Sequence, residues 1–133
     1  MTDPRETLAR IRAQADAATE GPWEAEYSGE QGNCVLPPEY QSTREAVAVT
    51  RLLSAQADAE FIAHARTDVP ALLDALEKVL RLHPRVVVLH ADPEFGRMED
   101  DAICGACIVN HEPADWPCPT VEAITTALNG DAA

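Results

Sequence analysis

Apolar residues recur at intervals of three and four positions in several stretches of the chain, a spacing that places them on one face of a helix. One stretch predicts a helix over about residues 4–19, with Asp3 as its N-cap and Pro4 as its first residue. Another predicts a helix that begins at Ser54. A shorter stretch after Pro119 predicts a final helix near the C-terminus.

The strongest apolar stripe lies in a further predicted helix, over about residues 68–82, for which Thr67 offers an N-cap. Pro70 falls in the first turn of this helix, where a missing N–H costs nothing because it has no partner within the helix. The stripe should therefore face the core. We expect its leucines to pack against apolar residues of the earlier elements, with Leu72, Leu73, Leu76 and Leu80 against Leu8, Ile11, Trp23 and Phe61.

Alternating apolar and polar residues, which are typical of a half-buried strand, mark residues 23–27. A second strand is predicted at 46–50, pairing with the first, and a third in the apolar run 85–90. Gly, Asn and Pro residues predict a loop over 29–43, and the acidic segment 91–102 is expected to be irregular. Together the elements predict an α+β fold in which helices pack on a small antiparallel sheet.

The charge of the chain is strongly negative, with 23 acidic and 10 basic residues and a formal net charge of −13. This field repels phosphate backbones and no cluster of Lys or Arg offsets it, so direct nucleic-acid binding is disfavoured. Nine acids and one base lie within residues 90–133. They form either a solvated acidic face or an interface for a protein partner with a basic surface.

The first ten residues, MTDPRETLAR, lack the basic and apolar segments of an export signal, and no run of 18 apolar residues occurs. We therefore expect a cytoplasmic protein that makes no membrane contact. Because thiols stay reduced in the cytosol, metal binding explains clustered cysteines better than disulfides do.

Three of the four cysteines have the spacing of metal ligands. Cys104 and Cys107 form a CxxC motif, in which Gly105 permits a tight backbone path, and Cys118 follows after ten intervening residues. A structural zinc ion takes about four nitrogen or sulfur ligands, so one histidine would complete the set. Redox-active thiols and an iron–sulfur cluster are the alternatives to zinc.

Two histidines compete for the fourth position. His90, at the end of an apolar segment before the CxxC motif, is preferred, and His111, in the loop after that motif, is the alternative. Cys34 is a weaker candidate and is expected to be a free thiol. His64 and His83, on or beside predicted helices, are expected to be surface or capping residues. With the zinc knuckle included, the predicted organisation is a helix and small-sheet domain over residues 1–84 and a zinc-binding acidic tail over 85–133, packed on or next to it.

Two segments of the chain resemble known small proteins. The segments ATEGPW (18–23) and DAEFIAHARTDVPALLDALE (58–77) are similar to uncharacterised proteins of actinobacteria and their phages, related to the Ea-like early-region proteins of lambdoid phages. The segment WPCPTVEAI (116–124) resembles a short His/Cys tail of small actinobacterial proteins. The resemblance implies a phage or prophage accessory gene and the zinc ligands His90, Cys104, Cys107 and Cys118.

Recognisable catalytic motifs are absent from the sequence: it contains no P-loop, no dinucleotide glycine motif, no GxSxG and no HExxH. We expect a non-enzymatic phage-type accessory protein, in which structural zinc stiffens an acidic module for binding a host or phage protein. The alternative is an inhibitor of a host nucleic-acid-handling or defence protein that mimics the charge of DNA. A zinc-dependent hydrolase is the third hypothesis. The acidic stretch Asp92–Asp101 is the expected interaction surface.

Overall fold

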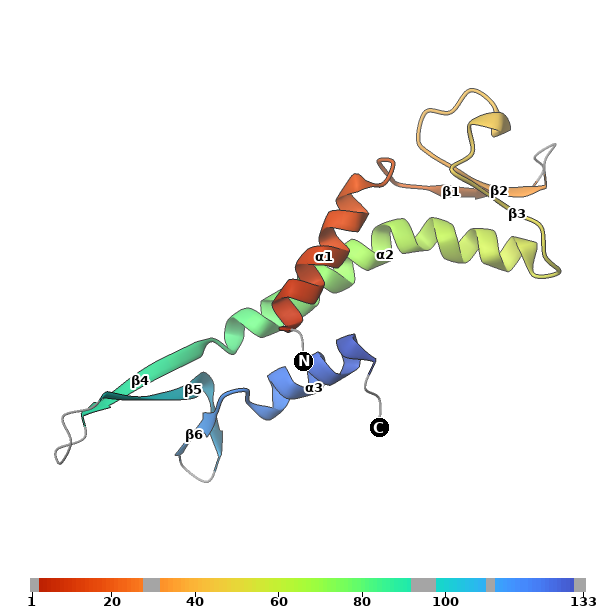
Figure 1. The fold of residues 1–133 in the computed structure, drawn as a ribbon. Helices are drawn as coiled ribbons and strands as arrows, with labels where there is room; N and C mark the ends of the chain where they lie inside the picture. Colours follow the sequence, from red (N-terminus) through yellow and green to blue (C-terminus); the bar gives the residue numbers. More distant parts are fainter. Residues whose placement is uncertain (1–2, 28–31, 92–97, 110–111, 131–133) are drawn as a thin grey trace. The chain divides into compact units, whose positions relative to one another are not determined.

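The computed structural model describes residues 3–27, 32–91, 98–109 and 112–130 (Figure 1). Within these ranges the chain forms three α-helices, one short 3-10 helix and two antiparallel sheets of three strands each. The predicted α+β class is therefore confirmed. In chain order the elements are α1 (Pro4–Ala17), β1 (Glu24–Glu26), β2 (Asn33–Leu36), η1 (Thr43–Glu45), β3 (Ala48–Thr50), α2 (Ala55–Leu82), β4 (Arg85–Ala91), β5 (Met98–Val109), β6 (Glu112–Asp115) and α3 (Pro119–Asn129).

The contacts divide the chain into two compact units. One is Arg10–Asp74, and the other combines Met1–Ala9 with Ala75–Ala133. We call them the central unit and the terminal unit. The division falls within α1 and α2, so each of these helices contributes to both units. The end of α2 thus belongs to the same unit as the C-terminal residues.

In the central unit, β2 is the middle strand of the sheet, with β1 and β3 on either side. The predicted loop over 29–43 therefore contains a strand, and β3 pairs with β2 instead of with β1. The reason is burial, because Cys34, Val35 and Leu36 are the most buried consecutive residues of the sheet, at 1%, 0% and 0% exposure. Gly, Asn and Pro residues flank these three positions, so the sequence pattern indicates a loop where the structure has a strand of only four residues.

The structure has one long helix, α2, where the sequence predicted two. Pro70 lies inside it, and Thr67 does not cap a new helix, since its hydroxyl donates a hydrogen bond to the backbone carbonyl of His64 at 3.0 Å. Proline removes one hydrogen bond from the helix. Buried residues on both sides of it, Ala63 and Leu73, continue the packed face and offset that loss.

The predicted packing of the leucine stripe is correct for some positions and wrong for others. Leu8, Leu73 and Leu80 are buried, whereas Leu72 is 63% exposed and Phe61 is 75% exposed. Phe61 and Leu72 are eleven residues apart, about three helical turns, so they share one face of α2. That face points to solvent among the described residues of the central unit. The sequence pattern cannot separate it from the buried face, because both carry apolar side chains.

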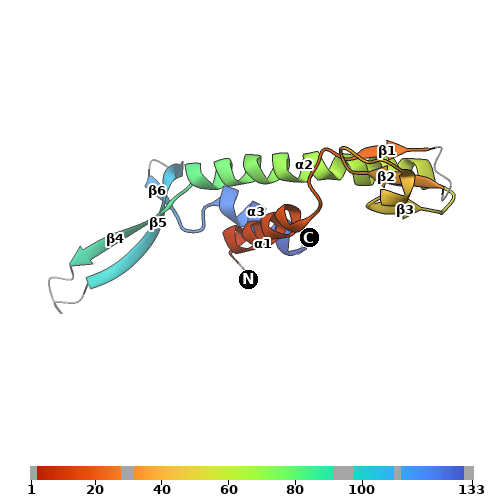
Figure 2. The same cartoon turned by 90° about the horizontal axis from the view of Figure 1, so that it is seen from above.

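In the terminal unit, β4 and β5 form a long antiparallel hairpin and β6 pairs with the other edge of β5 (Figure 1, Figure 2). The predicted strand at 85–90 is confirmed as β4. The segment Met98–Asp101, part of the stretch expected to be irregular, lies in β5 opposite Val88–Ala91, while 92–97 are outside the described residues. Pairing along the hairpin thus overrides the low strand propensity of acidic side chains.

Among the described residues, no helix has the length and apolar character that crossing a membrane would require.

Candidate metal centre

Four side chains of the terminal unit form a group that can hold a metal ion: His83, Cys104, Cys107 and Cys118. They come from three different elements. His83 is the first residue after α2, Cys104 and Cys107 lie in β5, and Cys118 is the N-cap of α3. The group therefore joins the end of one helix, the hairpin and the start of another helix.

The four side chains converge closely. Nδ1 of His83 lies 3.5 Å from Sγ of Cys104, 3.2 Å from Sγ of Cys107 and 3.6 Å from Sγ of Cys118. All four candidate ligand atoms lie within 4.8 Å of one another. Cys104 and Cys118 are buried, at 2% and 0% exposure, and the other two are half-buried. Such separations fit ligands that share a single ion.

The structure thus brings the three predicted cysteines together, but with His83 instead of the expected His90. The register of the hairpin is the reason. Cys104 lies opposite Arg85, two residues after His83, whereas His90 lies opposite Glu99. His90 is therefore five residues along β4 from Arg85, which corresponds to about 16 Å of extended strand. The side chain of His90 itself is outside the described residues.

The other residues considered as ligands lie elsewhere. Cys34 is a free cysteine buried in β2 of the central unit, where burial raises the pKa of its thiol. His64 is exposed on α2 of the same unit. His111 is outside the described residues. The prediction that Cys34 is a free thiol is consistent with this placement.

The backbone of the CxxC turn favours a thiolate at its first position. Burial alone would raise the pKa of Cys104, but hydrogen bonds from the backbone N–H groups of Ala106 and Cys107, together with those to His83 and Cys118, outweigh it. They lower the pKa of the Cys104 thiol from 9.0 to about 6. This lowered pKa favours the thiolate, which is the metal-binding form.

The neighbouring sulfurs have the opposite effect on the second cysteine of the motif. Hydrogen bonding with Cys118, followed by burial, hydrogen bonding with Cys104 and the charges on both of these sulfurs, raises the pKa of Cys107 from 9.0 to about 11. Three sulfurs this close resist ionising together, because each negative charge opposes the next. A divalent cation between them would remove this obstacle and deprotonate all three.

The third sulfur is at a helix N-terminus. Cys118 is the N-cap of α3, and its side chain makes no capping hydrogen bond. Pro119 follows as the first helical residue, and the backbone carbonyl of Cys118 accepts a hydrogen bond from Glu122 at 2.9 Å. The start of α3 thus brings the sulfur of Cys118 to the other three candidate ligands.

Gly105 allows the close approach of the hairpin strands behind the CxxC turn. Its N–H donates to the backbone carbonyl of Pro84 at 2.9 Å. A Cβ atom at this position would lie 2.9 Å from Cγ of Pro84 and 3.0 Å from Cγ2 of Val86. From the sequence, Gly105 is expected to provide the backbone freedom that a tight turn needs. In the structure its role is steric, because it lets Pro84, and with it the preceding His83, approach the two cysteines.

Arg5 links the residues on either side of the metal centre. One of its terminal nitrogens, Nη2, donates hydrogen bonds to the backbone carbonyls of Leu80 at 3.0 Å and His83 at 3.4 Å. Its guanidinium also lies 5.4 Å from the ring centroid of Trp116, two residues before Cys118. Arg5 satisfies carbonyls at the end of α2 and makes a cation–π contact with the loop that leads to α3. Arg5 thus contacts His83 itself and a near neighbour of Cys118, two of the four candidate ligands.

Comparison with known proteins gives no relative: no protein-family model, no curated protein and no solved structure matches this chain. The functional interpretation therefore depends on the geometry of the group formed by His83 and the three cysteines.

Proposed function

We propose that His83, Cys104, Cys107 and Cys118 bind one structural zinc ion, and that the terminal unit is a non-enzymatic, zinc-stabilised interaction module. The distances carry the proposal. With Zn–S bonds of about 2.3 Å and Zn–N bonds of about 2.0 to 2.1 Å, a nitrogen and a sulfur at two corners of a tetrahedron are about 3.6 Å apart. The three distances from Nδ1 of His83 are 3.2, 3.5 and 3.6 Å.

The donor set supports zinc over the alternatives. Three thiolates and one imidazole are ligands that Zn²⁺ favours in structural sites. An iron–sulfur cluster spreads its ligands over several irons, whereas all four ligand atoms here lie within 4.8 Å of one another. Four protein ligands also fill a tetrahedron. They leave no open position for a catalytic water, which supports a structural role over a hydrolase.

The first test is the metal content of the purified protein. We expect about one zinc per chain by elemental analysis, because the four ligands form one tetrahedral set. Replacement of zinc by cobalt should give the intense visible absorption of a tetrahedral ion and the thiolate-to-metal absorption in the near ultraviolet. A folded protein with much less than one metal ion per chain, or a cobalt spectrum typical of six-coordination, would contradict the proposal.

The surface around the metal centre supports the interaction role. Val86, Val87, Ile108 and Val109 are 38%, 41%, 74% and 49% exposed on β4 and β5. On the neighbouring strand β6, Glu112 and Asp115 are exposed acids. Apolar side chains with charged neighbours are typical of protein interfaces, and the net charge of −13 favours a partner with a basic surface.

A capture experiment tests this role. We expect the zinc-loaded protein to retain a basic partner from cell lysate, and the retention to fall steeply as salt is raised. The variant Glu112→Gln/Asp115→Asn/Glu122→Gln should retain its zinc and its melting temperature, because exposed charges contribute little stability, while its capture weakens and depends less on salt. Glu6→Gln/Glu20→Gln/Glu24→Gln, which neutralises the same number of exposed acids elsewhere, is the matched control. Equal capture by both triple variants and the unaltered protein would refute the acidic interface.

A further inference from the structure

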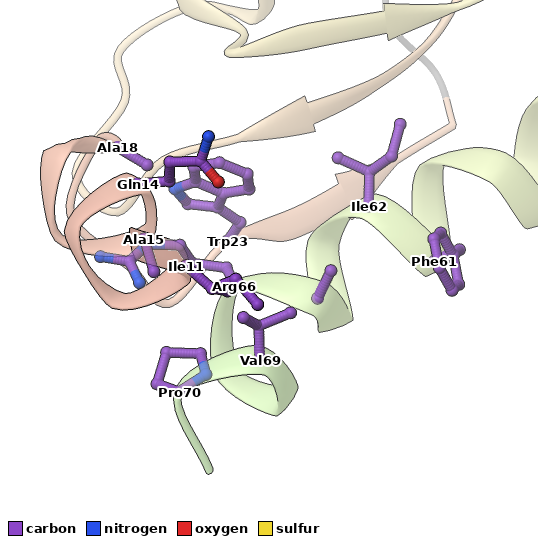
Figure 3. A pocket seen from close by; sticks show the side chains of 11 residues that line it. Ile11, Gln14, Ala15, Ala18, Trp23, Phe61, Ile62, Arg66, Val69 and Pro70 are labelled. Atoms are coloured by element: carbon purple, nitrogen blue, oxygen red, sulfur yellow. The ribbon is translucent and has the colours of Figure 1, made fainter. Parts of the chain in front are cut away.

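The central unit contains a groove that the zinc site does not use. It has a volume of about 340 Å³ and is lined by side chains from the second half of α1, from Trp23 and from α2. Figure 3 shows its walls, formed mainly by Ile11, Trp23, Ile62 and Val69. Phe61, which is 75% exposed, also lines it. The groove is thus largely apolar and open to solvent.

The charge of the groove is opposite to that of the chain as a whole. The protein has a net charge of −13, yet none of the described residues that line the groove is acidic. Arg66 is the single charged residue among them, accompanied by the amide of Gln14. In the described part of the chain, Arg66 has no ion pair with a carboxylate. An arginine without a carboxylate partner beside an apolar surface fits an anionic group carried on an apolar body.

The guanidinium of Arg66 is held in place before any ligand arrives. Its Nε donates a hydrogen bond to the backbone carbonyl of Thr19 at 2.9 Å, and its Cζ lies 5.9 Å from the ring centroid of Trp23. The indole Nε1 of Trp23 donates to the same carbonyl at 3.1 Å. One carbonyl therefore orients both the cation and the aromatic wall. The two terminal nitrogens of a guanidinium held through Nε can still bind a carboxylate in a bidentate manner.

Gly21 provides the space that this arrangement needs. A Cβ atom at Gly21 would lie 2.8 Å from Cγ and 3.5 Å from Nε of Arg66. An alanine at this position must therefore displace the Arg66 side chain, although it leaves the charge of the protein unchanged. This close approach gives a way to test the placement of the guanidinium separately from its charge.

From these observations we infer that the groove binds a small apolar monocarboxylate, with its carboxylate on Arg66 and its body against Trp23 and Ile62. The volume lies at the lower end of the range for small-molecule pockets. The net charge of −13 disfavours an acidic protein segment as the occupant, because such a segment would be repelled at long range. A single carboxylate is paired locally by Arg66 and meets little repulsion in 0.15 M salt.

Calorimetric titration of the purified 133-residue protein with decanoate tests the inference. Decanol, which has the same apolar body without charge, and decylammonium, which has the opposite charge, are the comparison ligands. We expect decanoate to bind about tenfold or more tightly than decanol and decylammonium to bind least, since a charge-assisted hydrogen bond changes affinity by about 10- to 100-fold. In the Trp116→Phe background, which leaves Trp23 as the only tryptophan, decanoate should also change the tryptophan fluorescence.

Three variants assign the effect to the groove. Arg66→Met should weaken decanoate binding by about tenfold or more while leaving decanol binding nearly unchanged. Gly21→Ala should weaken decanoate binding in the same direction without removing charge. Arg81→Met, which removes an exposed arginine from the terminal unit, should have no effect. If Arg66→Met does not fold, Gly21→Ala and the comparison of decanoate with decanol on the unaltered protein still decide the question.

The results that would overturn the inference are specific. Absence of decanoate binding at submillimolar concentration, or equal affinity for decanoate and decanol, would show that Arg66 does not select a carboxylate. Binding that survives both Arg66→Met and Gly21→Ala would place the ligand elsewhere. Binding of an acidic amphipathic peptide but not of decanoate would identify the groove as a peptide site and reject the small-molecule assignment. None of these outcomes depends on the zinc proposal, whose own test is metal content.

Discussion

The His83→Ala variant is expected to lose zinc, whereas His90→Ala should retain it. Removing His83 leaves three sulfur ligands and an open coordination position. Loss of a ligand should lower zinc affinity by more than the 10- to 100-fold typical of changes in residues that only support a ligand. Because binding a structural zinc contributes about 10 to 16 kcal/mol in small zinc domains, much of the stability of the terminal unit should be lost with the metal. Competition with a chromophoric chelator measures the affinity, and thermal unfolding measures the stability.

A rescue variant separates the loss of a ligand from general damage at the end of α2. His83→Cys supplies a fourth thiolate, and four cysteines form a common structural zinc set. We expect this variant to bind about one zinc per chain and to recover most of the stability that His83→Ala loses. Retention of tightly bound zinc by His83→Ala, together with its loss from His90→Ala, would reverse the assignment and restore His90 as the ligand.

Alanine at Leu80 is expected to destabilise the protein by about 2 to 5 kcal/mol, whereas alanine at Leu72 should change the free energy of unfolding by no more than about 0.5 kcal/mol. Both leucines lie in α2, so the change in helix propensity is the same in the two variants. They differ in burial: Leu80 is 2% exposed and Leu72 is 63% exposed. Chemical denaturation of the zinc-loaded protein measures both effects under identical conditions.

A large loss at Leu72 would show that its face of α2 is covered in solution. Running the Leu72→Ala experiment at two protein concentrations distinguishes contact with a second copy of the chain from burial within a single copy. Only a stability that depends on concentration indicates self-association. A loss below about 1 kcal/mol at Leu80 would instead contradict the packing of α2 in the terminal unit.

The sequence by itself determined the features that depend on local spacing. The amphipathic period predicts the helices α1 and α3 and the apolar character of α2. Asp3 receives the expected capping hydrogen bond on Oδ1, from the backbone N–H of Arg5 at 2.7 Å. The CxxC motif identifies two sulfur donors because two residues between cysteines bring both thiols to one turn. The α+β class and the three sulfurs of the candidate metal centre could therefore be predicted from the sequence alone.

Tertiary structure decided the features that depend on long-range pairing. His83 joins Cys104 because β4 and β5 pair with Arg85 opposite Cys104, and a shift of this register would bring other residues to the metal centre. In the same way, β2 forms a strand because the burial of its side chains outweighs the loop preference of the flanking residues. Arg66 lies beside an apolar groove because residues of α1, α2 and Trp23 line the same space. Local propensity is a property of neighbouring residues. Register, burial and the exposed face of α2 depend on contacts between residues far apart in the chain, and their energies act only once the chain has folded.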